Sequence, residues 1–211
     1  MKKYFFILFF AFAIAPLFSQ NPKNIKIVPS VSLFEKGSQY IEKEEFEKSI
    51  LQFIKIPEGD TLYSNAQFYM ALAYYYTKQN ENAIICLKNV LKNLPENIPA
   101  TSIYNVLGYV YISNNQFSEA TQILEKSIQI APYNYRILTI LGTAYMELNQ
   151  LVLAEQAIQK SIFCAPTNQY SHFLLGKLYL KQGKMAPAIL AFNYTVFLNP
   201  KSDQAIEAYK L

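Results

Sequence analysis

Apolar residues recur three or four positions apart along most of this chain, in stretches of about a dozen residues separated by short polar segments. That spacing places the apolar side chains on one face of a helix, so each stretch predicts an amphipathic α-helix. The stretches come in pairs joined by a polar turn, such as "NNQ" at 114–116, "LNQ" at 148–150 and "KQGK" at 181–184. The pattern therefore predicts a succession of helix–turn–helix units.

Particular residues return at a constant interval within these units. A Leu-Gly pair begins at 107, 141 and 175, and each pair is followed by a Tyr, an Ala and a Pro at matching positions. All of these positions are 34 residues apart; they are Tyr111, Tyr145 and Tyr179, then Ala120, Ala154 and Ala188, then Pro132, Pro166 and Pro200. A fixed interval of this length is typical of stacked repeats, which bury their apolar faces against one another.

The same spacing extends upstream with two irregularities. Ala71, Tyr74 and Pro95 keep the internal spacing but lie 37 residues before the next unit, because three residues are added around "ENIPATS". One unit further upstream Gly37 is in register, but Thr61 stands where the Pro is expected. The repeat therefore predicts five units, the first of them degenerate.

This pattern resembles that of the tetratricopeptide repeat (TPR) family over roughly residues 30–202. The resemblance implies an all-α fold, an α-solenoid of about five helix–turn–helix units in a right-handed superhelix. We assign the units to 30–63, 64–100, 101–134, 135–168 and 169–202, followed by a partial capping helix at 203–211. That last segment either caps the array or begins a further repeat of a longer protein.

Small residues are expected where the two helices of a unit meet. A larger side chain at Gly108 or at its equivalent Gly142 would push the two backbones apart, because a well-packed core does not accept added volume. Ala120 has the same role on the second helix, and Tyr111 fills the space between the helices with its hydroxyl near the edge. Each Pro then ends a second helix.

The first residues, "MKKYFFILFFAFAIAPLFSQ", resemble a secretory signal. Two lysines precede an apolar run of about a dozen residues, which suits a signal-peptide core and is short for a membrane span. We predict cleavage between Ser19 and Gln20, with retention as a membrane anchor as the alternative. The N-terminal segments are thus a signal peptide at 1–19 and a short linker at 20–29. The protein is then exported, to the periplasm or cell envelope of a bacterium, and associates with a membrane only if the signal is retained.

Composition and motifs argue against an enzyme. His172 is the only histidine, and six glycines leave little material for phosphate-binding loops. The chain has none of the common metal, nucleophile or phosphate motifs. We therefore predict no catalytic residue, no metal or other cofactor and no small-molecule substrate. A glycan-acting enzyme would need two converging carboxylates, and no spacing here predicts them.

Charge and cysteine content narrow the partners further. The net charge of +4 falls to +2 without the two lysines of the signal, too weak a charge to indicate nucleic acid. Cys86 and Cys164 lie in second helices two units apart, beyond the reach of a disulfide. We expect them to be separate small core residues. Because neither nucleic acid nor a small-molecule substrate is predicted, another protein or a peptide remains as the partner.

The resemblance also implies where such a partner binds. In the TPR family the first helices line a concave surface through their second, fifth, ninth, twelfth and thirteenth repeat positions. From these positions we select as the partner-binding groove Asn65, Phe68, Leu72, Tyr75, Tyr76, Asn105, Tyr109, Ile112, Arg136, Met146, Phe173 and Lys177. The aromatic members suit a peptide with apolar anchors; the alternative is that several of these rings only pack between repeats.

The sequence therefore predicts an exported TPR scaffold or adaptor that binds a protein or peptide through its concave groove. Two alternatives stay open. The chain is a regulatory or assembly subunit of an envelope complex, or it is the truncated TPR part of a longer multidomain protein.

Overall fold

The computed structural model describes residues 29–211 and folds them into eleven α-helices, with no strand in that part of the chain. Consecutive helices pack as five pairs, followed by one short final helix. The pairs are α1 (Ser30–Glu42) with α2 (Phe46–Phe53), α3 (Tyr63–Tyr76) with α4 (Asn80–Lys92), α5 (Ala100–Ser113) with α6 (Phe117–Ile130), α7 (Tyr135–Glu147) with α8 (Leu151–Cys164), and α9 (Gln169–Lys181) with α10 (Met185–Leu198); the final helix is α11 (Asp203–Ala208). The predicted all-α solenoid is confirmed. The predicted signal and almost all of the linker lie outside the described residues.

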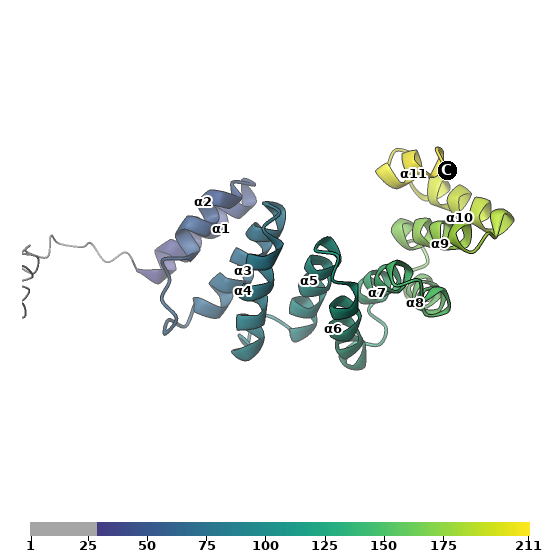
Figure 1. Ribbon diagram of the computed structural model, residues 1–211. Coiled ribbons are helices and arrows are strands. Elements are labelled where there is room, and N and C mark those ends of the chain that lie inside the picture. The colour runs from purple at the N-terminus through teal and green to yellow at the C-terminus, as the bar shows by residue number, and fades with distance from the viewer. Residues whose placement is uncertain (1–28) are drawn as a thin grey trace, which may run out of the picture.

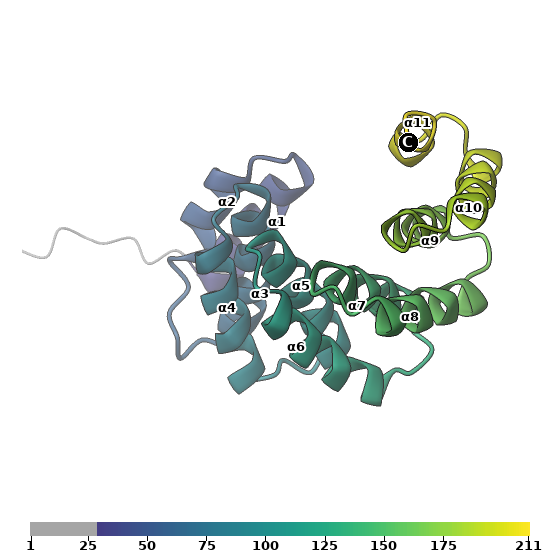
Figure 2. The same cartoon turned by 45° about the vertical axis from the view of Figure 1, so that its right-hand side comes forward.

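The helix pairs follow one another along a curved stack (Figure 1). Each first helix contacts the first helix of the next unit, from α1 through to α9 and on to α11, whereas no successive second helices of the described stack contact each other. The first helices therefore line the inner side of the curve, and α4, α6, α8 and α10 follow its outer side (Figure 2). None of the described helices combines the length and the apolar character that crossing a membrane requires.

A left-handed residue makes the tight turn between the two helices of every unit. These residues have φ between 56° and 73° and occupy equivalent positions; they are Glu44, Lys78, Asn115, Asn149 and Gly183. The next residue closes each turn with a backbone hydrogen bond, as when the Gln79 N–H donates to the Tyr74 carbonyl at 2.8 Å. Gly and Asn adopt this conformation readily. Lys78 adopts the same conformation, so the turn sets the direction in which its side chain leaves the backbone.

The glycines of the first helices lie directly against the second helices. A Cβ placed on Gly142 would be 2.5 Å from Ile158 Cγ1, and one on Gly108 would be 2.6 Å from Leu124 Cδ2. Contacts this short do not occur between real side chains, so only glycine permits the observed approach. The predicted role of these glycines in helix packing is confirmed.

The repeated tyrosine Tyr145 makes a hydrogen bond to the preceding unit, in addition to the expected packing within its own unit. Tyr145 is buried, and its hydroxyl donates a hydrogen bond to Glu125 Oε1 at 2.6 Å. Burial is the main cause that raises the pKa of Tyr145 well above its usual range, and the neighbouring Glu125 carboxylate raises it further. The phenol therefore remains a protonated donor, which links α7 to α6 of the preceding unit.

Three buried hydroxyls meet where α7, α8 and α9 come together. Thr139 Oγ1 lies 2.7 Å from Ser161 Oγ and 3.0 Å from Ser171 Oγ, and the two serine oxygens are 2.9 Å apart. The equivalent of Ser161 one unit upstream is Ser127, which is buried but has no hydrogen-bond partner. The same repeat position thus carries a hydrogen-bonded serine in one unit and an isolated one in the next.

We expect Ser161→Ala to lower the free energy of unfolding by about 1–2 kcal/mol, because it removes one member of a buried hydrogen-bonded set and leaves Thr139 and Ser171 with fewer partners. Ser127→Ala is the matched control and should change that free energy by less than about 0.5 kcal/mol, since no hydrogen bond is lost. Urea denaturation followed by circular dichroism measures both. Equal losses in the two variants would contradict this account.

Candidate partner-binding groove

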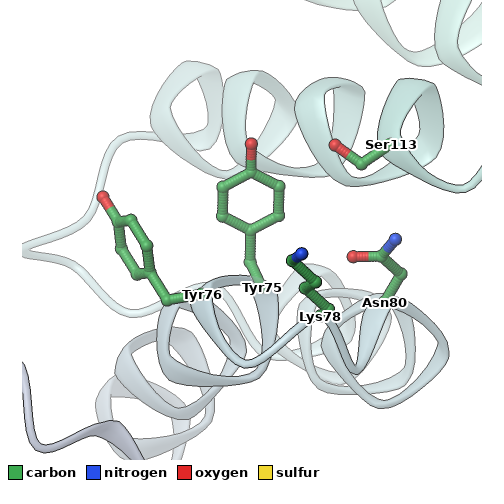
Figure 3. A pocket seen from close by; sticks show the side chains of 5 residues that line it. All are labelled: Tyr75, Tyr76, Lys78, Asn80 and Ser113. Atoms are coloured by element: carbon green, nitrogen blue, oxygen red, sulfur yellow. The ribbon is translucent and has the colours of Figure 1, made fainter.

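Two adjoining cavities lie on the inner side of the stack, where α3 faces α5. The first, which we call the aromatic cavity, has a volume of about 320 Å³ and is lined by Leu72, Tyr75, Tyr76, Val106 and Tyr109. The second, the polar cavity, has a volume of about 520 Å³ and is lined by Tyr75, Tyr76, Lys78, Asn80 and Ser113 (Figure 3). Because Tyr75 and Tyr76 line both, the two cavities form one groove with an apolar part and a polar part.

Helical periodicity brings the lining residues together. Leu72, Tyr75 and Tyr76 are three and four residues apart on α3, so they share one face of that helix. On α5, Val106 and Tyr109 are three residues apart and face the same space. Each wall of the aromatic cavity is therefore one face of one first helix.

The rings of this wall are held in place before any ligand is present. Tyr76 stacks on Phe46, with ring centroids 4.6 Å apart and an interplanar angle of 10°, and Tyr75 meets Tyr76 edge-on at 5.6 Å. Phe46 is the first residue of α2, so the first unit positions a ring of the second. Tyr76 remains 60% exposed and Tyr109 42% exposed. An ordered and exposed aromatic wall offers contact area at low entropic cost.

Tyr109 adds a hydrogen-bond donor to the apolar wall. Burial is the main cause that raises the pKa of its phenol above the usual value, and the neighbouring Tyr170 and Tyr75 raise it further. The hydroxyl is therefore protonated at neutral pH. It can donate to a carbonyl of a bound segment.

The polar cavity carries one cation and two neutral hydrogen-bonding groups. Lys78 lies in the turn between α3 and α4, with φ of 61°, and no carboxylate of residues 29–211 forms an ion pair with it. Asn80 begins α4 and Ser113 ends α5. Figure 3 shows the three side chains directed into the space between α3 and α5. Such a set can bind the carbonyls or a carboxylate of a peptide.

Four of the predicted groove residues come together in the aromatic cavity. They are Leu72, Tyr75, Tyr76 and Tyr109. Phe68 and Ile112 are half-buried and pack against the core beside it. Asn65 and Asn105 are also half-buried, and the Oδ1 atom of each has no hydrogen-bond partner.

The prediction is wrong for Met146 and Phe173. They are only 6% and 3% exposed, so neither side chain can contact a partner. Phe173 packs in a cluster with Phe192, at 5.9 Å between ring centroids, and with Ala208 of the final helix. α11 covers Phe173, and the 34-residue repeat pattern does not include that helix.

Arg136 and Lys177 are exposed but line neither cavity. Arg136 Nε donates to the hydroxyl of its neighbour Tyr135 at 3.2 Å. Lys177 Nζ forms an ion pair with Glu207 Oε1 at 3.3 Å, which ties α9 to α11. Lys177 therefore contacts the last helix, whereas Arg136 lies near enough to Tyr109 for its charge to oppose the rise in the pKa of that phenol.

Lys78, Asn80, Val106 and Ser113 line the groove but were not among the predicted residues. Ser113 occupies the thirteenth repeat position of its unit. Lys78 and Asn80 belong to the turn and the following second helix, whereas the repeat positions used for prediction all lie on first helices. Val106 lies on a first helix, outside the five selected positions. The one available signal was that Lys78 is the cation of the polar turn "KQNE" at 78–81.

Other reactive side chains of the described chain have structural roles. His172 Nε2 lies 2.7 Å from the Pro166 carbonyl oxygen, and its ring centroid is 4.5 Å from that of Tyr194. Cys86 and Cys164 are unpaired, and burial raises the pKa of the Cys86 thiol to about 11. Residues 29–211 contain no group of His, Cys, Asp and Glu side chains that could hold a metal ion.

Comparisons with known proteins agree with this architecture. A family model described as ChAPs (Chs5p-Arf1p-binding proteins) matches residues 61–206. The chain therefore belongs to the ChAPs family, and its fold is that of a TPR-type helical repeat protein. A comparison with curated proteins gave no match.

Solved structures of repeat proteins resemble the whole stack. MamA 41-end from Desulfovibrio magneticus RS-1 is 20% identical over 82% of this chain and 97% of its own, with a TM-score of 0.73. YrrB, a TPR protein with an unusual peptide-binding site, is 15% identical over 96% and 98% of the two chains, with a TM-score of 0.67. TTC0263, a thermophilic TPR protein in Thermus thermophilus, is 16% identical over 86% and 98%, also with a TM-score of 0.67. At these identities the likeness concerns the fold alone.

Proposed function

We propose that this chain is an exported, non-enzymatic TPR scaffold that binds a protein or peptide segment in the groove between α3 and α5. The observation that carries the proposal is the continuity of the aromatic and polar cavities on the inner side of the stack. Binding sites combine apolar walls with a few polar groups that fix orientation. Here Tyr75, Tyr76 and Tyr109 supply the walls, and Lys78, Asn80 and Ser113 supply the polar groups.

The size and shape of the groove favour a peptide segment over a small molecule. Its walls are exposed helix faces, and the aromatic cavity can hold one large apolar side chain of a segment that crosses α3 and α5. The polar cavity then receives the neighbouring backbone carbonyls or an acidic group. The descriptions of YrrB and of the ChAPs family also refer to binding. That of YrrB mentions a peptide-binding site, and that of the ChAPs family mentions binding to Chs5p and Arf1p.

The proposed cellular location of the protein rests on its sequence. The apolar run behind two N-terminal lysines suits a secretory signal. We propose that the mature chain begins at Gln20 and acts in the periplasm or cell envelope of a bacterium. A scaffold in that compartment holds a partner that is exported as well.

The test introduces a photoreactive amino acid at position 109 in intact cells and identifies the crosslinked segment by mass spectrometry. The affinity of the corresponding synthetic peptide is then measured by fluorescence anisotropy. Tyr75→Ala/Tyr109→Ala should weaken binding at least tenfold, because aromatic residues at the centre of an interface contribute about 2 kcal/mol or more when truncated. The intact mass of protein recovered from the same cells reports its N-terminus.

The matched control is Tyr133→Ala/Tyr209→Ala, which removes two exposed tyrosines outside the groove and should leave the affinity unchanged. Undiminished binding by Tyr75→Ala/Tyr109→Ala removes these residues from the site. A crosslink that forms at exposed Tyr133 but not at position 109 contradicts the groove itself. Recovery of the chain with Met1 still present contradicts the cleaved signal.

A further inference from the structure

The outer face of α10 is apolar over half of its circumference. Leu190 is 71% exposed and Phe197 78% exposed, and three further large side chains are exposed beside them: Met185, Ile189 and Tyr194. At about 100° per residue these positions span roughly 180° of the helix. Asn193 is the one amide within the face.

The fold does not require this apolar character. The opposite half of α10 supplies the packing, through Ala188, Ala191, Phe192 and Thr195, all of which are buried. At the position of Leu190, α6 and α8 carry Gln122 and Gln156, which are exposed. At the position of Phe197, α6 carries Gln129. α4 carries the exposed Ile85 at the position of Leu190, and α8 carries the exposed Phe163 at the position of Phe197. At the position of Tyr194, however, α4, α6 and α8 carry Asn89, Lys126 and Lys160, so the apolar face is continuous only in the last unit.

Charge is also distributed unevenly along the stack. Residues 169–211 contain five lysines and two carboxylates, a net charge of +3, whereas residues 29–168 contain ten basic and thirteen acidic residues, a net charge of −3. α10 itself contains no charged residue, and Lys184 and Lys201 lie just before and just after it. Lys184 Nζ lies 3.8 Å from Glu155 Oε2, whereas Lys201 forms no ion pair within residues 29–211. The apolar face is therefore placed in the positively charged end of the molecule.

We infer that the outer face of α10 binds the surface of a bilayer that contains anionic phospholipids. A helix of 14 residues is too short to cross the hydrocarbon core, which takes about 20 residues. It can lie in the interface with its apolar half among the acyl chains, while Lys201 and the net positive charge of this end attract anionic headgroups. α10 is on the convex side of the stack, so it can meet a flat surface without interference from the groove (Figure 2).

A second copy of the chain suits this face less well, because pairing two α10 helices would bring together two ends that each carry +3. A protein partner would ordinarily form about one hydrogen bond per 100–200 Å² of interface. The face offers only the Asn193 amide and the Tyr194 hydroxyl for such bonds. A lipid surface needs neither, so the observations favour it over both alternatives.

Cosedimentation with phosphatidylcholine vesicles, with and without phosphatidylglycerol, tests this inference. The full chain is compared with a form beginning at Gln20, which retains every described helix and whose folding is checked by circular dichroism. Both should bind the anionic vesicles, more weakly at high salt. Leu190→Asp/Phe197→Asp should weaken binding by the Gln20 form at least tenfold, because it places two charges in the lipid-facing side.

The matched control is Ile85→Asp/Ile130→Asp, which changes two similarly exposed residues on α4 and α6 and should bind within twofold of the unaltered chain. Three results would overturn the inference. The first is equal vesicle binding by the α10 variant and the control. The second is vesicle binding by the full chain but not by the Gln20 form, which would assign the binding to the N-terminal segment. The third is a dimer that the α10 variant dissociates, without vesicle binding, which would assign the face to a second copy.

Discussion

Gly142→Leu is expected to lower the free energy of unfolding by about 3 kcal/mol, at the upper end of the usual range for overpacking in a core. The Cβ alone would lie 2.5 Å from Ile158 Cγ1, and Ile158 is completely buried, so it has no free space into which to move. The remaining three carbons of Leu would separate α7 from α8. Because each unit of a solenoid depends on its neighbours, this damage also weakens the interfaces to α6 and α9.

Thermal and urea denaturation measure this effect, and Gly59→Leu provides the control. Gly59 has no heavy atom within 4 Å of its added Cβ, so its substitution should change the free energy of unfolding by less than about 0.5 kcal/mol. A Gly142→Leu variant that unfolds like the unaltered chain would refute the close packing of the two helices.

Phe173→Ala is expected to lower the free energy of unfolding by about 3–4 kcal/mol, because it removes a buried ring and leaves a cavity. The ring packs against Phe192 at 5.9 Å and belongs to the cluster that holds α11 on the last unit. Loss of the ring should therefore release α11 first. Hydrogen exchange should show faster exchange in residues 169–211 than in α3 and α5.

Phe163→Ala is the matched control, since Phe163 is 78% exposed and its removal should cost less than about 0.5 kcal/mol. Phe173→Ala should leave peptide binding at the α3–α5 groove within twofold, because the groove is formed by other units. The opposite result, loss of binding without loss of stability, would restore Phe173 to the binding surface and remove it from the core.

The repeated residues carried most of the fold prediction. Gly108 and Gly142 have the roles that their spacing indicates, because the two helices of a unit pack through residues of that unit. Burial at the concave side depends on the neighbouring unit as well. Phe173 occupies the same repeat position as Asn105, yet it is buried by α11 whereas Asn105 is half-buried. The repeat position alone could not distinguish them.

The site was predicted in its apolar half and missed in its polar half. Leu72, Tyr75, Tyr76 and Tyr109 follow from the helical spacing of first helices. Lys78 reaches the groove only because a left-handed turn directs it there. The turn position recurs in every unit, but its residue type varies between Glu, Lys, Asn and Gly. The direction of the Lys78 side chain therefore becomes known only from the three-dimensional arrangement of α3, α4 and α5.

The contacts between successive first helices have a mechanical consequence. First helices touch their successors along the inner side, but in the described chain second helices do not touch theirs. Each second helix also packs against the first helix of the next unit, so bending the stack pivots neighbouring units about these interfaces and compresses or opens the inner side. We therefore expect the width of the space between α3 and α5 to change together with the local curvature of the stack. A segment that wedges between Tyr75 and Tyr109 would straighten the stack, and one that draws them together would curl it.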